Sequence, residues 1–478
     1  MNADIAVIGL AVMGQNLILN MNDKGFKVLA YNRSHEKTEA FLRGPAAGTQ
    51  VEGVYSLQDL VKKLSQPRKI LLMVKAGEAV DALINQLSPL LGKGDILIDG
   101  GNSNFTDTIR RVASLREKGI AYLGAGISGG EEGARFGPSI MPGGNKDAWP
   151  HVKPILQAIA AKTKSGEPCC DWVGEGGAGH FVKMVHNGIE YGDMQLISEA
   201  YDFMKRALGL SNSAMQAVFQ DWNKSELDSY LIQITADILG TQDEAGDYVL
   251  DTILDSAGQK GTGKWTSIHA LNFGVPLNLI TESVYARFIS TLKPQRVLAS
   301  SVFTQEVRPI TQEGTTDSIS LTAWLTALRQ ALLASKIISY AQGFMLMQSA
   351  SREYNWSLNL ANVALMWRGG CIIQSGFLQN IADAFNEDPA LDFLGLNHYF
   401  KSLLENAMVD WRKVAAKAVE IGLPMPCTLS GISFLDAYTT ARLPANMIQA
   451  QRDYFGAHTY ERLDKPLGEF FHYNWLGH

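Results

Sequence analysis

In roughly the first 175 residues, short apolar runs alternate with amphipathic stretches, and polar or glycine-rich turns follow several of the runs. This alternation is typical of parallel strands joined by crossover helices, because neighbouring parallel strands need a long connection. We therefore expect an open, mostly parallel sheet covered by helices. The predicted strands are Ile5–Ile8, Val28–Tyr31, Ile70–Val74, Ile96–Asp99 and Tyr122–Ala125.

The pattern changes at a glycine-rich turn that runs from Gly174 to Gly179. Beyond it, strand-like runs are rare, and long stretches such as Phe181–Leu208, Leu325–Ser349 and Tyr399–Ile421 have apolar residues at helical spacing. A chain of 478 residues is also too long for one ordinary core. We predict an α/β domain over residues 1–177, a large all-helical domain over 178–440 and a short C-terminal tail over 441–478.

Composition and cysteine usage favour a cytoplasmic protein. Hydrophobic residues make up 46% and charged residues 19% of the chain, which is typical of a globular protein. No apolar run approaches the roughly 20 residues of a membrane span, and the start has no basic segment before an apolar one. The cysteines lack the spacing of zinc ligands, so we expect reduced thiols at Cys169, Cys170, Cys371 and Cys427.

The net charge of −6 argues against general nucleic-acid binding, which requires a basic face. A local basic pocket can still bind a small anion inside an acidic protein. We therefore expect a small-molecule ligand, and no nucleic acid or membrane as partner.

A glycine motif follows the predicted strand at Ile5–Ile8 and precedes an apolar helical pattern. It reads Gly9-Leu10-Ala11-Val12-Met13-Gly14. Gly9 permits the tight turn and Gly14 permits close packing of helix and strand, while the helix N-terminus offers free N–H groups to a phosphate. This context predicts a Rossmann-type dinucleotide site, the alternative being a merely tight strand–helix turn.

The end of the second predicted strand indicates which dinucleotide binds. NAD-specific sites usually place an acidic residue here, but this chain has Asn32-Arg33-Ser34. Asn32 removes the carboxylate that would repel a 2′-phosphate, Arg33 can pair with that phosphate, and Ser34 can donate a hydrogen bond. We predict NADP as the cofactor, although a lone arginine can also be a solvated surface charge.

Two further turns follow predicted strands at the carboxyl edge of the sheet, where open α/β folds bind ligands. One is Val74-Lys75-Ala76-Gly77 and the other is Gly100-Gly101-Asn102-Ser103. We predict that the first contacts the cofactor and that Asn102 lies between the nicotinamide and the substrate. An ordinary turn asparagine is the alternative.

One helical stretch carries polar side chains where a core-facing stripe is expected. At positions i, i+3, i+4, i+7 and i+8 it has Lys183, His186, Asn187, Glu190 and Tyr191. The alternative to a functional site is a solvent-exposed helix face with ion pairs, but such a face does not usually combine His, Asn and Tyr. Lys183 and Glu190 are about 10 Å apart along the helix axis, so they can reach different atoms of one substrate. A base at Lys183 requires a lowered pKa.

Four segments resemble the 6-phosphogluconate dehydrogenase family, and they occur in the family's order. They are the glycine motif with its alanine, Ile127-Ser128-Gly129-Gly130-Glu131-Glu132-Gly133-Ala134, Leu254-Asp255-Ser256-Ala257-Gly258-Gln259-Lys260-Gly261-Thr262-Gly263 and Gln451-Arg452-Asp453-Tyr454-Phe455-Gly456-Ala457-His458. The resemblance covers essentially the whole chain. It implies oxidative decarboxylation of 6-phospho-D-gluconate to D-ribulose 5-phosphate and CO2 with reduction of NADP, a step of the pentose phosphate pathway.

The resemblance also implies a role for each matching residue. Lys183 would be the general base and Glu190 the general acid. Arg452 and His458 would reach into the site of a partner subunit, which implies a homodimer with shared active sites. Ser34 replaces a threonine found in many members, and both supply a hydroxyl. The sugar acid would contact Ser128, Gly129, Gly130, His186, Asn187 and Tyr191, and its phosphate would contact Lys260, Thr262 and Arg287.

We expect no metal ion, because the sequence shows no compact carboxylate or histidine cluster to hold one, unlike decarboxylating dehydrogenases that polarise the keto group with a divalent cation. Two alternatives remain open at this point. A non-decarboxylating 3-hydroxyacid dehydrogenase would have little use for the cations Lys260, Arg287 and Arg452. A cofactor-binding sensor without turnover would have little use for Lys183 and Glu190.

Overall fold

The computed structural model describes residues 2–303, 307, 309–310 and 320–477. An eight-stranded sheet forms its N-terminal part, in the order β3-β2-β1-β4-β5-β6-β7-β8. Strands β1 to β6 are parallel, and β7 pairs antiparallel with β6. The strands are β1 Ile5–Ile8, β2 Val28–Tyr31, β3 Glu52–Gly53, β4 Lys69–Leu72, β5 Ile96–Asp99, β6 Ala121–Ile127, β7 Ile140–Gly144 and β8 Gly174–Glu175.

The predicted strands are confirmed, with corrections at two of them and additions at the edges. The strand predicted at Ile70–Val74 ends at Leu72, because the following residues turn against Gly9. The strand predicted at Tyr122–Ala125 extends to Ile127. Strands β3, β7 and β8 were not predicted, since two are only two residues long and β7 contains Pro142 and two glycines.

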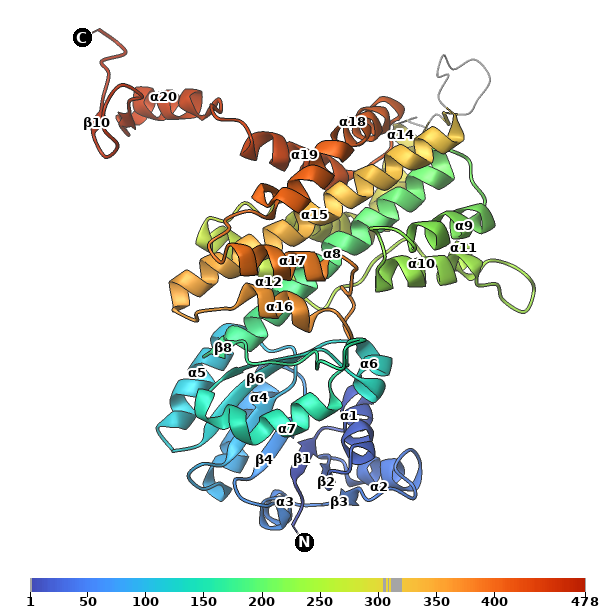
Figure 1. Ribbon diagram of the computed structural model, residues 1–478, viewed down its shortest axis with the longest axis vertical. Coiled ribbons are helices and arrows are strands. Elements are labelled where there is room, and N and C mark those ends of the chain that lie inside the picture. The colour runs from blue at the N-terminus through green and yellow to red at the C-terminus, as the bar shows by residue number, and fades with distance from the viewer. Residues whose placement is uncertain (1, 304–306, 308, 311–319, 478) are drawn as a thin grey trace.

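Helices cover both faces of the sheet (Figure 1). Alternate side chains of β1 point to opposite faces, so Ile5 and Val7 pack with α1, α2, α6 and α7, while Ala6 and Ile8 pack with α3, α4 and α5. These helices are α1 Val12–Asp23, α2 His35–Arg43, α3 Leu57–Lys63, α4 Glu78–Leu87, α5 Phe105–Arg116, α6 Gly130–Phe136 and α7 Trp149–Ile159, with short 3-10 turns at Ser88–Leu90 and Lys146–Ala148.

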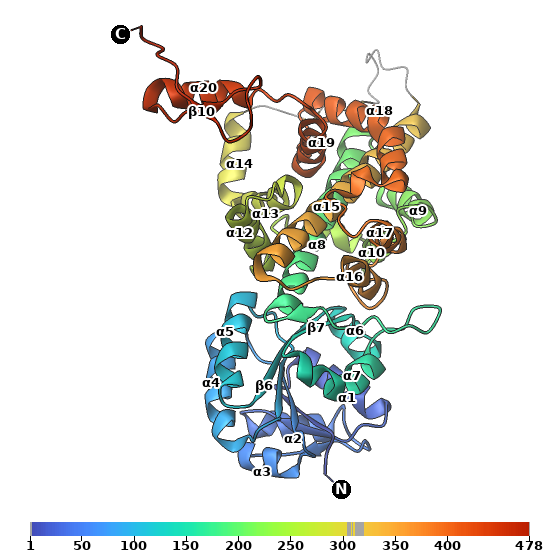
Figure 2. The ribbon, with the colours of Figure 1, turned by 60° about the vertical axis from the view of Figure 1, so that its left-hand side comes forward.

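The described residues from Ala178 to Tyr438 form helices joined by turns, as predicted, and they are built around α8 and α15. Helix α8 leaves the edge of the sheet and runs through the middle of the helical part, where it packs along α15 (Figures 1 and 2). The helices are α8 Ala178–Asp202, α9 Asn212–Trp222, α10 Tyr230–Gly240, α11 Val249–Thr252, α12 Thr262–Phe273, α13 Asn278–Thr291, α14 Lys293–Val302, α15 Leu321–Tyr354, α16 Leu360–Met366, α17 Leu378–Glu387, α18 His398–Ile421 and α19 Pro426–Tyr438, with a π-helical turn at Phe203–Ala207 and a 3-10 turn at Leu394–Leu396.

The C-terminal tail extends away from the rest of the chain (Figures 1 and 2). It contains α20 Ala445–Gly456 and a two-stranded ribbon of β9 Tyr460–Glu461 and β10 Phe470–Phe471. The buried Asp453 carboxylate holds it together by accepting hydrogen bonds from the Thr459 and Tyr473 N–H groups and from the Trp475 indole. Among the described residues, no helix is long and apolar enough to cross a membrane.

A buried ion pair joins α8 to α15. The Lys336 amine donates to Asp193 Oδ2 at 2.7 Å, and the two side chains are 0% and 1% exposed. Tyr340 lies beside the pair and donates its hydroxyl to the Ile373 carbonyl at 2.7 Å. Removal of the amine would leave a buried carboxylate without its counter-charge, which is costly in a low-dielectric interior.

We expect Lys336→Met to lower the free energy of unfolding by about 3–5 kcal/mol, the usual cost of breaking a buried pair. Arg352→Met is the matched control, because its pair with Asp392 is 66% and 67% exposed. That control should cost less than about 1 kcal/mol. Urea unfolding monitored by circular dichroism measures both, and equal losses would contradict the prediction.

Candidate active site

The glycine motif forms the turn between β1 and α1, and its geometry requires glycine at both ends. Gly9 has φ +108°, and a Cβ there would lie 2.3 Å from the Met73 carbonyl oxygen. A Cβ on Gly14 would lie 2.0 Å from the Gly9 carbonyl oxygen. No side chain caps the N-terminus of α1, and its first turn has no acidic residue. The turn therefore fits a pyrophosphate group.

The segment after β2 lies beside this turn. Asn32 accepts a hydrogen bond from the Leu10 N–H at 3.2 Å and donates to the Ser34 carbonyl at 3.2 Å, so it supports the glycine turn. That role was not predicted. Arg33 is exposed and free to meet a ligand, whereas the Ser34 hydroxyl donates to Glu36 at 3.3 Å. Lys37, also not predicted, lines a cavity with Leu10, Ala11 and Val12.

The two turns at the carboxyl ends of β4 and β5 lie against each other. A Cβ on Gly101 would lie 3.1 Å from the Val74 carbonyl oxygen. Lys75 and Asn102 are exposed on these turns. The structure thus brings Val74, Lys75 and Asn102 to the same sheet edge as the glycine turn.

The polar stripe of α8 is buried, so the alternative of a solvated face is wrong. Lys183, His186 and Asn187 are 6%, 0% and 8% exposed. Close approach to strand β6 causes much of this burial: a Cβ on Gly126 would lie 2.3 Å from the Lys183 Cβ. Gly126 was not predicted as a site residue, although a glycine inside a strand often marks such an approach.

A line of hydrogen bonds fixes the middle of the stripe. The Asn187 amide nitrogen donates to Thr262 Oγ1 at 3.0 Å, and its oxygen lies 3.1 Å from His186 Nδ1. His186 Nδ1 also lies 3.3 Å from the Lys183 amine, and His186 Nε2 lies 3.1 Å from the Ser128 hydroxyl. Burial, and then Lys183, hold the pKa of His186 well below its usual value. The neutral imidazole therefore links the turn after β6 to α12.

The pKa values of Lys183 and Glu190 are both shifted in the direction that favours the uncharged form. Burial lowers the pKa of the Lys183 amine, and Glu190 opposes the shift only in part. Burial raises the pKa of the Glu190 carboxyl against the effect of Lys183 and Arg287. The site thus holds an amine suited to accept a proton and a carboxyl suited to donate one.

A group of hydrogen-bond donors lies at the far end of the stripe. The Arg287 guanidinium stacks on the Tyr191 ring, with Cζ 3.5 Å from the ring centroid, and donates to the Gly258 carbonyl at 3.1 Å. Thr262 begins α12, whose N-terminus has no side-chain cap. Lys260 is exposed two residues earlier. In the turn after β6, Gly129 lies just before α6 at φ +107°, and Gly130, the first residue of α6, is exposed.

Arg452 and His458 are not brought to these residues within one chain. Both are exposed, on α20 and just after it, at the end of the helical part opposite the sheet (Figures 1 and 2). No group of three or more His, Cys, Asp or Glu side chains in the described ranges could hold a metal ion.

Comparison with known proteins identifies the family. The NAD-binding domain of 6-phosphogluconate dehydrogenase matches residues 4–174, and the C-terminal domain of 6-phosphogluconate dehydrogenase matches residues 179–475. The chain belongs to the 6-phosphogluconate dehydrogenase family.

Relatives in this family match over nearly their whole length. The decarboxylating 6-phosphogluconate dehydrogenase of Aggregatibacter actinomycetemcomitans is 65% identical over 99% of this chain and 96% of its own. The Homo sapiens enzyme is 59% identical over 100% of this chain and 97% of its own. The Plasmodium falciparum 6-phosphogluconate dehydrogenase, solved in its apo form and with NADP+ or 6-phosphogluconate, superposes with a TM-score of 0.94. That pair is 44% identical, covering 98% of this chain and 100% of the other.

The raised pKa of Glu190 predicts a pH-dependent effect on stability. A carboxyl whose pKa is raised on folding binds its proton more tightly in the folded state, so stability falls as pH rises from its ordinary value of 4.5 through the raised value, and stays reduced above it. Glu190→Gln cannot ionise, so its melting temperature relative to wild type should increase from about pH 4 to about pH 8. Glu353→Gln, at an exposed position, should show no such trend.

Differential scanning calorimetry across this pH range measures both variants. A constant difference between Glu190→Gln and wild type would contradict the prediction.

Proposed function

We propose that the protein is an NADP-dependent, decarboxylating 6-phosphogluconate dehydrogenase. The observation that supports this most directly is the presence of two proton-transfer groups, the buried Lys183 and the partly buried Glu190, on one helix between a dinucleotide turn and a group of cations. A reaction that removes a proton at one carbon and adds one at another needs such a pair.

The substrate lies along α8 in this proposal. Its phosphate binds to Lys260, Arg287 and the free N-terminus of α12 at Thr262, where helix N–H groups and cations favour an anion. Its sugar-acid part contacts residues of the stripe, of the turn after β6 and of the turn after β5, namely Ser128, Gly129, Gly130, His186, Asn187, Tyr191 and Asn102.

The dinucleotide lies on the carboxyl edge of the sheet. The turn at residues 9–14 holds the pyrophosphate, Arg33 and Ser34 hold the 2′-phosphate, and the turn at residues 74–76 and Asn102 lie toward the nicotinamide. NADP, when bound, accepts the hydride that leaves C3 of the substrate.

Neutral Lys183 accepts the proton of the C3 hydroxyl as C3 is oxidised to a ketone. The ketone is β to the C1 carboxylate, so the C1–C2 bond can break and C1 leaves as CO2. The electron pair of that bond stays on C2 and, together with the C3 carbonyl, forms an enediolate. Protonated Lys183 stabilises the oxygen on C3. Glu190 then donates a proton to the former C2, which becomes C1 of ribulose 5-phosphate.

The structure favours this function over the two alternatives. Lys260 and Arg287 beside the α12 N-terminus suit a phosphate, which a small unphosphorylated 3-hydroxyacid lacks. The pKa shifts of Lys183 and Glu190 suit turnover, which a cofactor-binding sensor does not perform.

Lys183→Met should lower kcat by about 100- to 10,000-fold, the usual contribution of general acid–base catalysis. A coupled assay with 6-phosphogluconate and NADP measures reduced cofactor and CO2 together. NADP affinity serves as the control and should stay near wild type. Turnover close to that of wild type would remove Lys183 from the role of base.

Arg33→Ala should cost NADP binding about 1.5–3 kcal/mol, the range for hydrogen bonds to charged groups. NAD lacks the 2′-phosphate, so kcat/KM with NAD should change little. The comparison of kcat/KM for both cofactors decides the point: an unchanged NADP-to-NAD ratio would show that other residues hold the 2′-phosphate.

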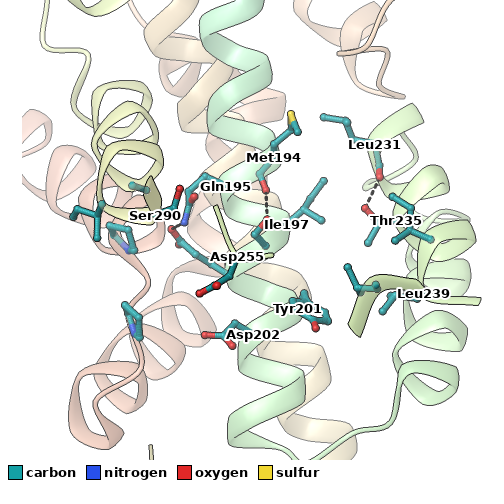
Figure 3. A pocket seen from close by; sticks show the side chains of 18 of the residues that line it. Met194, Gln195, Ile197, Tyr201, Asp202, Leu231, Thr235, Leu239, Asp255 and Ser290 are labelled. Atoms are coloured by element: carbon teal, nitrogen blue, oxygen red, sulfur yellow. Dashed lines mark hydrogen bonds between the residues drawn. The ribbon is translucent and has the colours of Figure 1, made fainter. Parts of the chain in front are cut away.

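We also propose a homodimer in which Arg452 and His458 of the partner subunit complete each phosphate site. The tail exposes apolar side chains such as Phe455 and Phe470, and α14 exposes Leu298, which suggests surfaces that another chain covers. A cavity of about 660 Å³ opens between helices of the helical domain, among them α8, α10 and α13. In it, Ile197 and Tyr201 of α8 point toward Leu231, Thr235 and Leu239 of α10 (Figure 3).

The domain limits at residues 177 and 440 remain part of this proposal, as does a cytoplasmic location. The cysteines Cys169, Cys170, Cys371 and Cys427 are all buried free thiols, which agrees with a reducing compartment.

Mixing two inactive variants tests the shared site. If Lys183→Met and Arg452→Ala subunits exchange, each heterodimer should have one site with both defects and one with neither, so activity should return toward one wild-type site per heterodimer. If the tail serves its own chain, every site keeps one defect. Subunit exchange verified by mass spectrometry without recovery of activity would contradict the shared site.

A further inference from the structure

We propose that Arg111 is a positioning residue for the cofactor site, tying the turn after β4 to the turn after β5 from behind. The inference rests on the proposed function. These two turns carry Lys75 and Asn102. Both turns lie outside helices and strands, so no backbone ladder holds them in place.

Arg111 lies on α5 and reaches the first turn through α4. Its Nη2 donates to the Gly77 carbonyl oxygen at 3.0 Å. Its Nε and Nη2 donate to the two carboxylate oxygens of Asp81, at 2.9 and 3.1 Å. Gly77 is the residue from which α4 begins, at φ +90°. The guanidinium therefore fixes the point where the turn enters the helix, and α4 and α5 lie side by side on this face (Figure 2).

The same side chain reaches the second turn through Asp99. Arg111 Nη1 lies 3.4 Å from both Asp99 Oδ2 and Ser103 Oγ. The Asp99 carboxylate also accepts from the Gly101 N–H at 3.0 Å and from the Ser103 hydroxyl at 2.6 Å. Both neighbours of Asn102 are thus bonded to one carboxylate, which leaves the Asn102 side chain presented outward.

The part of this network around Asp99 is buried, whereas the Asp81 side chain is 34% exposed. The side chains of Arg111 and Asp99 are 1% and 0% exposed, and the Tyr122 hydroxyl supplies a further donor to Asp99 at 2.9 Å. A planar guanidinium can bridge two carboxylates and a carbonyl at fixed angles, whereas an ammonium has a single charged atom.

The opposite ends of the same strands provide a matched control. Arg68, just before β4, donates from Nη1 to Asp95, just before β5, at 2.9 Å, and from Nε to the Val61 carbonyl at 2.9 Å. Its side chain is 20% exposed and Asp95 is 3% exposed. This pair joins the same two strands at the edge away from the cofactor turns.

The test compares Arg111→Met with Arg68→Met. Both should lower the unfolding midpoint, since each leaves a buried carboxylate without its partner. Only Arg111→Met should raise the Kd for NADPH, by at least about ten-fold, because small misplacements of binding groups have effects of this size. Energy transfer from tryptophan to NADPH measures Kd without turnover, and kcat/KM for 6-phosphogluconate should fall in parallel.

If Arg111→Met fails to fold, Arg111→Lys and Arg68→Lys replace the pair. Lysine keeps the charge but cannot bridge both turns, so Kd for NADPH should rise several-fold at position 111 and stay unchanged at position 68. Equal Kd values in the 111 and 68 variants would overturn the inference. A wild-type protein that binds NADPH but does not oxidise 6-phosphogluconate would instead contradict the proposed function, and the Kd comparison would still decide the role of Arg111.

Discussion

Helix α8 is buried along most of its length, and the rest of the structure is arranged around that burial. Glycines on its neighbours let them approach: a Cβ on Gly126 of β6 or Gly343 of α15 would lie within 2.6 Å of an α8 side chain. From Ala178 to Asp193, every residue of α8 except Glu190 is buried, so this part of the helix has almost no solvated side. The polar stripe therefore lies between the turn after β6 on one side and α12 on the other, and it is hydrogen-bonded to both.

Two different outcomes of burying charge occur on this one helix. Asp193 pairs directly with Lys336, and the ion pair joins α8 to α15. Lys183 and Glu190, ten and three residues earlier, have no such ion pair. Both contact His186 Nδ1, which lies 3.3 Å from the Lys183 amine and 3.8 Å from the Glu190 carboxylate, and desolvation shifts the pKa of each group toward its neutral form. A buried ionisable group without a close counter-charge weakens a fold, and enzymes accept that cost at sites where proton transfer is needed. The paired Asp193 and Lys336 thus have a structural role, whereas Lys183 and Glu190 are suited to proton transfer.

Sequence reasoning found the features that depend on local pattern. The parallel strands, the glycine turn and the α8 stripe follow from periodicity and spacing, and the structure confirms the fold. It missed β7, because Pro142 and the glycines beside it are typical of a turn. It also missed the roles of Arg111 and Gly126, since their partners lie on other elements and no local pattern marks them. The contribution of the tail to a partner's site remains a prediction.

The central claim is that burial, rather than any chemical modification, makes Lys183 a base. The most direct measurement is an NMR titration of ¹³Cε-labelled lysines, with the Lys183 resonance assigned by its absence in Lys183→Met. The account predicts that Lys183 titrates below the ordinary lysine pKa of 10.5, because burial disfavours its charged form. A Lys183 pKa at or above 10.5 would contradict the account.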